Sequence, residues 1–115
     1  MTPSAYVPDA SDLIWTDFDP TGGREQAGRR PALVVSSMVF TENTGLSVVC
    51  PITSRVRPLP TSVVLPPGLP VAGEVRVSHI RAIDTLARPV RYAGAGVPPA
   101  VAQLVRAKLN TFITI

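Results

Sequence analysis

Cysteine and histidine are almost absent from this sequence of 115 residues, which has one of each, Cys50 and His79. A single cysteine excludes an intrachain disulfide and is typical of a reducing compartment. Because Cys50 lies inside the apolar run 46–52, we interpret it as a small core residue. With one cysteine and one histidine, the sequence cannot form the spaced Cys and His pairs that are typical of metal sites, and paired carboxylates of the usual kind are missing. We therefore expect neither a metal site nor a cofactor.

Targeting signals and nucleotide-binding motifs are missing as well. The first twelve residues contain no basic region followed by an apolar stretch, and no run approaches membrane-spanning length. Glycine-rich phosphate loops of the P-loop or dinucleotide kind are absent, and nothing resembles a nucleophile elbow. We therefore expect a cytoplasmic protein, with little support for nucleotide-dependent or serine-hydrolase chemistry.

The overall composition is that of a folded chain. Apolar residues make up 45% of the sequence and charged residues 17%, which argues against disorder. Thirteen prolines and eight glycines predict short strands separated by turns rather than long helices. One domain spanning 1–115 is large enough for a modest core and small enough that oligomerisation would add stability.

Charge is distributed unevenly along the chain. Residues 1–20 carry four acids and no Lys or Arg, whereas 21–115 carry eleven bases and four acids, so the two parts have net charges of −4 and +7. Ten of the eleven bases are arginine. The planar guanidinium matches phosphate and carboxylate oxygens, so this bias favours an anionic partner. A GC-rich genome would also enrich arginine, and this alternative stays open.

Apolar runs rich in β-branched residues predict several short strands. The runs are 12–18, 32–40, 46–53 and 61–65, and the alternating segment 74–84 is typical of a strand with two differently used faces. The connection 41–45 contains Asn43 and Gly45 and is suited to a hairpin between the second and third runs. Short strands with frequent turns indicate a small, strongly bent barrel.

The period changes at 98–113, which predicts a closing helix. Pro98 and Pro99 occupy positions where a helix start tolerates proline. Six apolar side chains fall on one helical stripe, namely Val101, Leu104, Val105, Leu109, Phe112 and Ile113. We expect this stripe to pack on the barrel or across a subunit interface.

Three ordered motifs resemble the MazF/PemK family of toxin endoribonucleases. The first is DLIWTDFDPTGGREQAGRRP at 12–31, which matches the family's opening pattern except that Ser11 replaces the usual glycine. The second is PITS at 51–54, and the third is VSHIRAID at 77–84. This resemblance implies a mainly β fold, an SH3-like barrel with appended helices, including a C-terminal amphipathic helix, and a homodimer. It also implies the toxin of a type II toxin–antitoxin system, silenced by a cognate antitoxin.

The activity implied by the resemblance is sequence-specific cleavage of single-stranded RNA. RNA supplies its own nucleophile, the 2′-hydroxyl, so the protein need only move protons and stabilise charge. The products would be a 2′,3′-cyclic phosphate and a 5′-hydroxyl. We expect the antitoxin to bind through an acidic, partly disordered segment, and we expect no membrane partner.

Three catalytic residues are carried over by position in the motifs. Arg30 takes the catalytic arginine position, although it would otherwise be interpreted as a surface ion pair with Glu25 or Asp19. Thr53 takes the catalytic threonine position at the end of a strand, where threonine also commonly bonds nearby backbone. Glu25 is the candidate base for the 2′-hydroxyl proton, or else it orients Arg29 or Arg30.

Five further residues are candidates for RNA binding: Arg29, Arg55, Arg57, His79 and Arg81. The arginines at 55 and 57 follow PITS in a loop, where ordinary solvated charge is the alternative. His79 departs from the glutamine common in relatives, and we favour substrate contact over an acid/base role or packing in the sheet. Trp15 and Phe18 are interpreted as core residues because the chain has few aromatics.

Two other functions remain compatible with these residues. The same fold hosts toxins of the CcdB kind, which poison DNA gyrase by binding and perform no catalysis, so fold alone does not separate the two. A non-catalytic RNA-binding barrel would keep a basic groove without needing both Arg30 and Thr53. The EQAGRRP and PITS motifs favour the ribonuclease.

Overall fold

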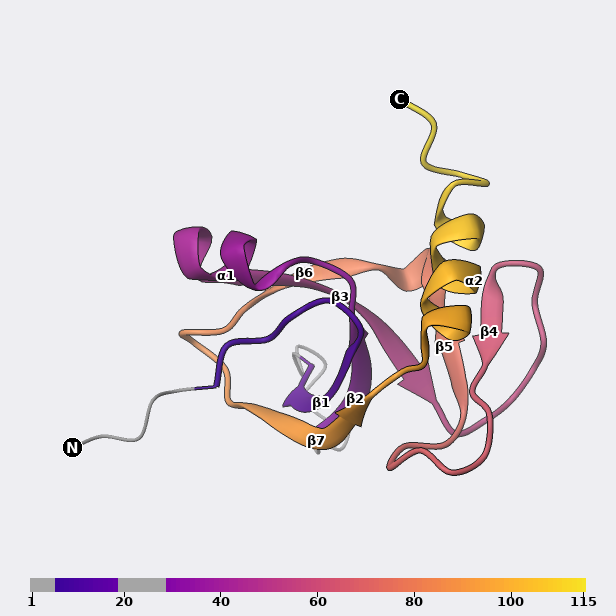
Figure 1. Ribbon diagram of the computed structural model, residues 1–115, viewed down its shortest axis with the longest axis horizontal. Helices are drawn as coiled ribbons and strands as arrows, with labels where there is room; N and C mark the ends of the chain where they lie inside the picture. The colour runs from indigo at the N-terminus through magenta and orange to yellow at the C-terminus, as the bar shows by residue number, and fades with distance from the viewer. Residues whose placement is uncertain (1–5, 19–28) are drawn as a thin grey trace.

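A computed structural model describes residues 6–18 and 29–115, and its strands form a strongly curved sheet accompanied by two helices (Figure 1). Within these ranges the strand order is β4-β5-β3-β2-β1-β7, β6 pairs with β3, and all pairs are antiparallel. The elements are β1 Asp12–Asp17, β2 Arg29–Val34, α1 Met38–Thr44, β3 Leu46–Thr53, β4 Ser62–Val64, β5 Glu74–Arg76, the 3₁₀ helix η1 Val77–His79, β6 Arg81–Asp84, β7 Val90–Gly96 and α2 Pro99–Leu109. The predicted mainly β fold with a C-terminal helix is confirmed.

The central strands bury side chains on both faces. On β1, Leu13 enters one apolar cluster and Ile14 enters another, because neighbouring side chains point to opposite faces. The first cluster is closed by β4, β5 and α2, and the second by residues of β6 and β7 and by the segment before β1. Burial on both faces explains the nearly continuous apolar runs in the sequence. Cys50 is fully buried, as predicted.

The predicted strand 32–40 is confirmed only for residues 32–34, and the predicted hairpin at 41–45 is wrong. The strand ends at Val34, and α1 follows from Met38 to Thr44. Ser37 caps this helix, since its Oγ accepts from the Phe40 N–H at 3.1 Å. Gly45 ends the helix with a φ of 78°, a left-handed conformation that glycine adopts without strain. Capping signals at both ends therefore prevailed over the apolar strand pattern.

The predicted strand 74–84 is interrupted. The chain forms β5, then one 3₁₀ turn at Val77–His79, then β6, and the two strands pair with different parts of β3. Strand β7 was not predicted, because its sequence VRYAGAG has small residues and lacks an apolar alternation. Gly96 in β7 lies so close to β1 that a Cβ there would be 2.6 Å from the Ser11 carbonyl oxygen.

Helix α2 begins at the predicted prolines but ends at Leu109, short of Ile113. Val101 and Val105 pack into the first cluster, whereas Leu104 is 47% exposed, so the barrel covers only part of the predicted stripe. Helix α2 stands beside β4 and β5, whereas α1 contacts β3 and lies on the opposite side of the view (Figure 1). In the described part of the chain, neither helix is long and apolar enough to cross a membrane.

Candidate active site

The pairing of β2 with β3 places Arg30, at the start of β2, beside Thr53, at the end of β3. Ala32 lies opposite Pro51 in antiparallel register. Arg30 and Thr53 are two residues beyond this pair on their strands, and side chains two apart share a face. Both residues line a single open cavity of about 470 Å³. Strand β3 ends at Thr53, as predicted.

Trp15 and the segment 70–72 form further walls of this cavity, together with Arg29 and Ser54. Trp15 also packs against the first apolar cluster, which confirms its interpretation as a core residue. The same residue lines the cavity. The 70–72 wall was missed, because no motif marks Pro70, Val71 or Ala72.

The Thr53 hydroxyl has a defined backbone partner. Its Oγ1 accepts a hydrogen bond from the Arg55 N–H at 3.1 Å, the local bond that strand-end threonines commonly make. A hydroxyl that accepts one bond still has its own proton to donate. The local bond therefore orients Oγ1 and is compatible with donation to a phosphate oxygen in the cavity.

The backbone of Thr53 is fixed from the side of β5. Thr53 pairs with Glu74, and Gly73 precedes that pair with a φ of +133°. A Cβ at Gly73 would be 2.2 Å from the Thr53 carbonyl oxygen, so only glycine fits this approach. The candidate catalytic threonine thus sits at a tightly packed strand end.

Arg29 and Arg30 are exposed at the start of β2, opposite Asp17 and Thr16 of β1. Exposed guanidinium groups at a cavity edge are accessible to an anionic ligand. Glu25, the candidate base, lies outside the described residues, and so does Asp19, one of the ion-pair alternatives for Arg30.

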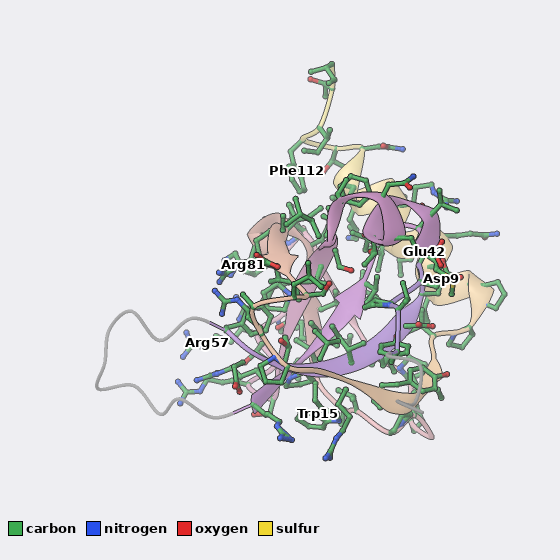
Figure 2. All side chains as sticks on the ribbon, turned by 90° about the vertical axis from the view of Figure 1, so that its left-hand side faces the viewer. Asp9, Trp15, Glu42, Arg57, Arg81 and Phe112 are labelled. Carbon is green, nitrogen blue, oxygen red and sulfur yellow. The ribbon has the colours of Figure 1, made fainter. Side chains whose placement is uncertain are left out.

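The remaining four RNA-binding candidates do not line this cavity. Arg55 and Arg57 are exposed on the loop that follows Thr53. His79 is exposed at the end of η1. Arg81 lies with its Cζ 5.2 Å from the Phe18 ring centroid, a cation–π contact. In Figure 2, Arg57 and Arg81 lie on one side of the molecule, and Glu42 lies on the opposite side.

A buried charge beside the cavity was not predicted from the sequence. Glu74 is fully buried, its Oε1 accepts from the Arg57 N–H at 2.8 Å, and Arg76 Nε lies 3.5 Å from the same oxygen. The Arg57 N–H is the main cause that holds the pKa of Glu74 below its usual value, against the opposing effect of burial, and Arg76 adds to the lowering. The glutamate at the start of the alternating segment 74–84 was the only available signal.

Comparison with known proteins gives consistent matches over almost the whole chain. Residues 9–113 match the family of PemK-like, MazF-like toxins of type II toxin–antitoxin systems. Endoribonuclease toxin MazF of Escherichia coli (strain K12) is 42% identical over 110 residues, which cover 96% of this chain and 97% of the relative. Endoribonuclease PemK of Escherichia coli is 37% identical over 106 residues, covering 88% and 79%.

Solved structures agree with the sequence matches. A crystal structure of MazF (Form-I) from Deinococcus radiodurans has a TM-score of 0.85 and 42% identity, covering 96% of this chain and all of that one. A MazE–MazF crystal structure (Form-II) from the same organism gives a TM-score of 0.83 at 40% identity, covering 96% and 99%.

Proposed function

Because this chain belongs to the PemK-like, MazF-like toxins of type II toxin–antitoxin systems, we propose that it is a metal-independent endoribonuclease cleaving single-stranded RNA at selected sequences. The observation that supports this most strongly is the shared cavity of Arg30 and Thr53. Relatives at 42% and 37% identity are named endoribonucleases, which favours this function over the gyrase poison and the non-catalytic barrel.

In the proposed reaction the ribose 2′-hydroxyl attacks the adjacent phosphorus. A base removes the 2′-hydroxyl proton, and the carboxylate of Glu25 takes this role by its position in the motif. The new P–O2′ bond forms as the P–O5′ bond breaks, and the departing 5′-oxygen gains a proton. The fragments end in a 2′,3′-cyclic phosphate and a 5′-hydroxyl, so atoms and charge balance without a metal or a cofactor.

Arg30 and Thr53 stabilise the phosphorus centre in this scheme. The Arg30 guanidinium is exposed at the cavity edge and offers paired N–H donors to the non-bridging oxygens as negative charge accumulates. The Thr53 hydroxyl, oriented by the Arg55 N–H, donates to one of the same oxygens. Both groups act only by hydrogen bonding and charge, which suits a substrate that brings its own nucleophile.

We assign binding of the flanking RNA to Arg29, Arg55, Arg57, His79 and Arg81. All five side chains are exposed, and four are cationic. Contacts to phosphates supply affinity without reading sequence, whereas stacking on Trp15 in the cavity would hold a base.

We propose that a cognate antitoxin inhibits by placing an acidic segment against the arginines near the cavity. The MazE–MazF structures from Deinococcus radiodurans show that such a pair forms in a relative at 40% identity. Binding of an acidic peptide should weaken as salt rises, because the target arginines are exposed. Equal binding to a variant with Arg29, Arg30, Arg55 and Arg57 all changed to serine would place the inhibitor elsewhere.

We also propose that residues 1–115 act as one toxin domain that forms a homodimer in the cytoplasm. Exposed apolar side chains on and after α2, at Leu104, Phe112 and Ile113, provide surface that a second copy would cover. Equilibrium sedimentation at micromolar concentration should give twice the chain mass of 12.2 kDa, and a single-chain mass would refute the dimer.

The function is tested by mapping the ends of a long unstructured RNA after treatment with purified protein and excess chelator. We expect cuts at a defined sequence, with cyclic phosphate ends that resist ligation requiring a free 3′-hydroxyl. No cleavage, combined with trapping of gyrase on DNA, would instead establish the gyrase poison and remove the catalytic roles of Arg30 and Thr53.

A further inference from the structure

The loop that joins β3 to β4 is attached at its centre to a buried carboxylate. We call residues 54–61 the arginine loop, because it carries Arg55 and Arg57. Building on the proposed function, we propose that Glu74 is a positioning residue for RNA binding, which holds the arginine loop so that both guanidinium groups are presented beside Thr53. Glu74 itself touches no substrate, since its side chain is fully buried.

The position of Glu74 in the sheet connects it to both ends of the loop. In β5 it pairs with Thr53, the last residue of β3, on one side and with Val64 of β4 on the other. Its Oε1 reaches out of this ladder and accepts from the Arg57 N–H at 2.8 Å. One side chain therefore links the candidate catalytic strand end to the middle of the loop that follows it.

Stability alone does not explain a carboxylate at this position. Glu74 lies in the sheet between Thr53 and Val64 and is fully buried, and an apolar side chain at this position would avoid the desolvation cost of a buried charge. An apolar side chain, however, offers no acceptor to the Arg57 N–H. What the carboxylate adds is a fixed geometry for the loop.

Other contacts hold the ends of the arginine loop but not its centre. The Arg55 N–H is bonded to Thr53 Oγ1 at 3.1 Å. At the far end, Lys108 Nζ of α2 donates to the Pro60 carbonyl oxygen at 2.7 Å. Loss of the Glu74 acceptor should therefore release the loop around Arg57 while leaving its two ends in place.

The consequence for function concerns affinity more than chemistry. A loop already held in its binding conformation loses less conformational freedom when RNA binds, which strengthens binding. Arg55 and Arg57 do not line the cavity that contains Arg30 and Thr53, so we assign their phosphate contacts to the flanking RNA rather than to the scissile phosphate. Release of the loop should raise KM and leave kcat nearly unchanged.

The direct test compares E74L, which removes the acceptor but fills the space, with E74Q, which keeps a neutral acceptor. We expect Arg57 amide exchange to accelerate in E74L, and KM for a short RNA with one cleavage site to rise about tenfold, equivalent to about 1.4 kcal/mol. E74Q should show a smaller rise in KM, because its amide oxygen can still accept from the Arg57 N–H. E42Q is the matched control, since Glu42 is exposed on α1 across the molecule from Arg57 (Figure 2) and should change neither quantity.

A double-mutant cycle separates positioning from general stabilisation. If Glu74 acts through the two loop arginines, E74Q should add nothing to the KM of a variant in which Arg55 and Arg57 are already serine. Fully additive effects, an unchanged KM in both Glu74 variants, or a loss confined to kcat would each overturn the proposal. A wild-type KM for R55S/R57S would also overturn the proposal, but it would not contradict the catalytic role of Arg30. If E74L does not fold, E74Q is used both for the measurement of amide exchange and KM and for the double-mutant cycle.

Failure of the proposed function would look different. A wild-type protein that cuts no RNA would refute the ribonuclease assignment and, with it, the role of Glu74 in RNA binding. The Arg57 amide exchange would then still report whether Glu74 holds the loop.

Discussion

Two groups of charged residues in this protein occupy opposite environments. Arg29 and Arg30 are exposed at the edge of an open cavity. Glu74 is fully buried two strands away, and Arg76 beside it is largely buried. Exposed charges contribute little to stability and are available to a ligand. Buried ones cannot meet a ligand and instead fix backbone geometry. Mutations of the exposed group should therefore lower activity with little effect on stability. Mutations of the buried group should also change stability.

The largest effect is expected for R30A, at the exposed edge. Removal of a group that stabilises developing charge should lower kcat by about a hundredfold to a thousandfold. Because the side chain is exposed, the free energy of unfolding should change by no more than about 0.5 kcal/mol. Single-turnover cleavage and urea unfolding measure the two quantities. R106A, an exposed arginine on α2, serves as the control and should retain activity. A folded R30A enzyme with near wild-type turnover would end the catalytic assignment.

Thr53 lies on β3, between the strand with the exposed arginines and the strand with Glu74. Substitutions at Thr53 therefore test whether its hydroxyl belongs to the active group. T53V removes the hydroxyl while keeping the branched shape, and loss of a hydrogen bond to a charged oxygen should cost about 1.5–3 kcal/mol of transition-state stabilisation. T53S keeps the hydroxyl and the acceptor for the Arg55 N–H, so it should recover most of the activity. Equal turnover by the valine and serine variants would show that the hydroxyl has no catalytic role.

Gly73 tests the tight packing on the buried side. G73A should lower the free energy of unfolding by more than G68A, although both glycines have positive φ, because only Gly73 has a neighbour in the way. Backbone strain alone accounts for about 1–3 kcal/mol in either variant. At Gly73 the new Cβ must also displace the Thr53 carbonyl, so cleavage should fall as well. Equal losses of stability in the two variants, with cleavage preserved, would argue against this close approach.

The smallest effect is the pH dependence contributed by Glu74. Its folded pKa lies below the value in the unfolded chain, which is about 4.3 for a free glutamate. The stability that it contributes is therefore fully present above that value and is lost as pH falls through the folded pKa. Urea unfolding should show that the stability difference between wild type and E74Q shrinks on acidification. A difference that is constant from neutral to acidic pH would contradict this.

The strands of the core could be predicted because their side chains follow simple burial patterns. Leu13 and Ile14 belong to opposite apolar clusters, and the sequence shows this as an apolar run. Helix α1 was missed although Ser37 and Gly45 carried ordinary capping signals, because the surrounding apolar residues resemble a strand. Strand β7 was missed because its pairing with β1 depends on small residues rather than on a hydrophobic pattern.

The candidate site was predictable only where residues sit in motifs. Arg30 and Thr53 are named by EQAGRRP and PITS, and the β2–β3 register brings them together. Glu74 carries no such signal. Its importance arises from β5 lying between β3 and β4, which places a carboxylate under a loop far away in the sequence. Such a contact is a property of strand order and cannot be derived from local sequence.

The most direct test of the proposed chemistry replaces one atom of the substrate. An RNA with a single cleavage site is compared with the same RNA carrying deoxyribose immediately 5′ of the scissile bond. If the 2′-hydroxyl is the nucleophile, the substituted RNA should remain uncut in excess chelator. It should still bind, because phosphate and base contacts are unchanged. The unmodified RNA should yield a cyclic phosphate end. Cleavage of the deoxy-substituted bond at a comparable rate would contradict the mechanism assigned to Arg30 and Thr53.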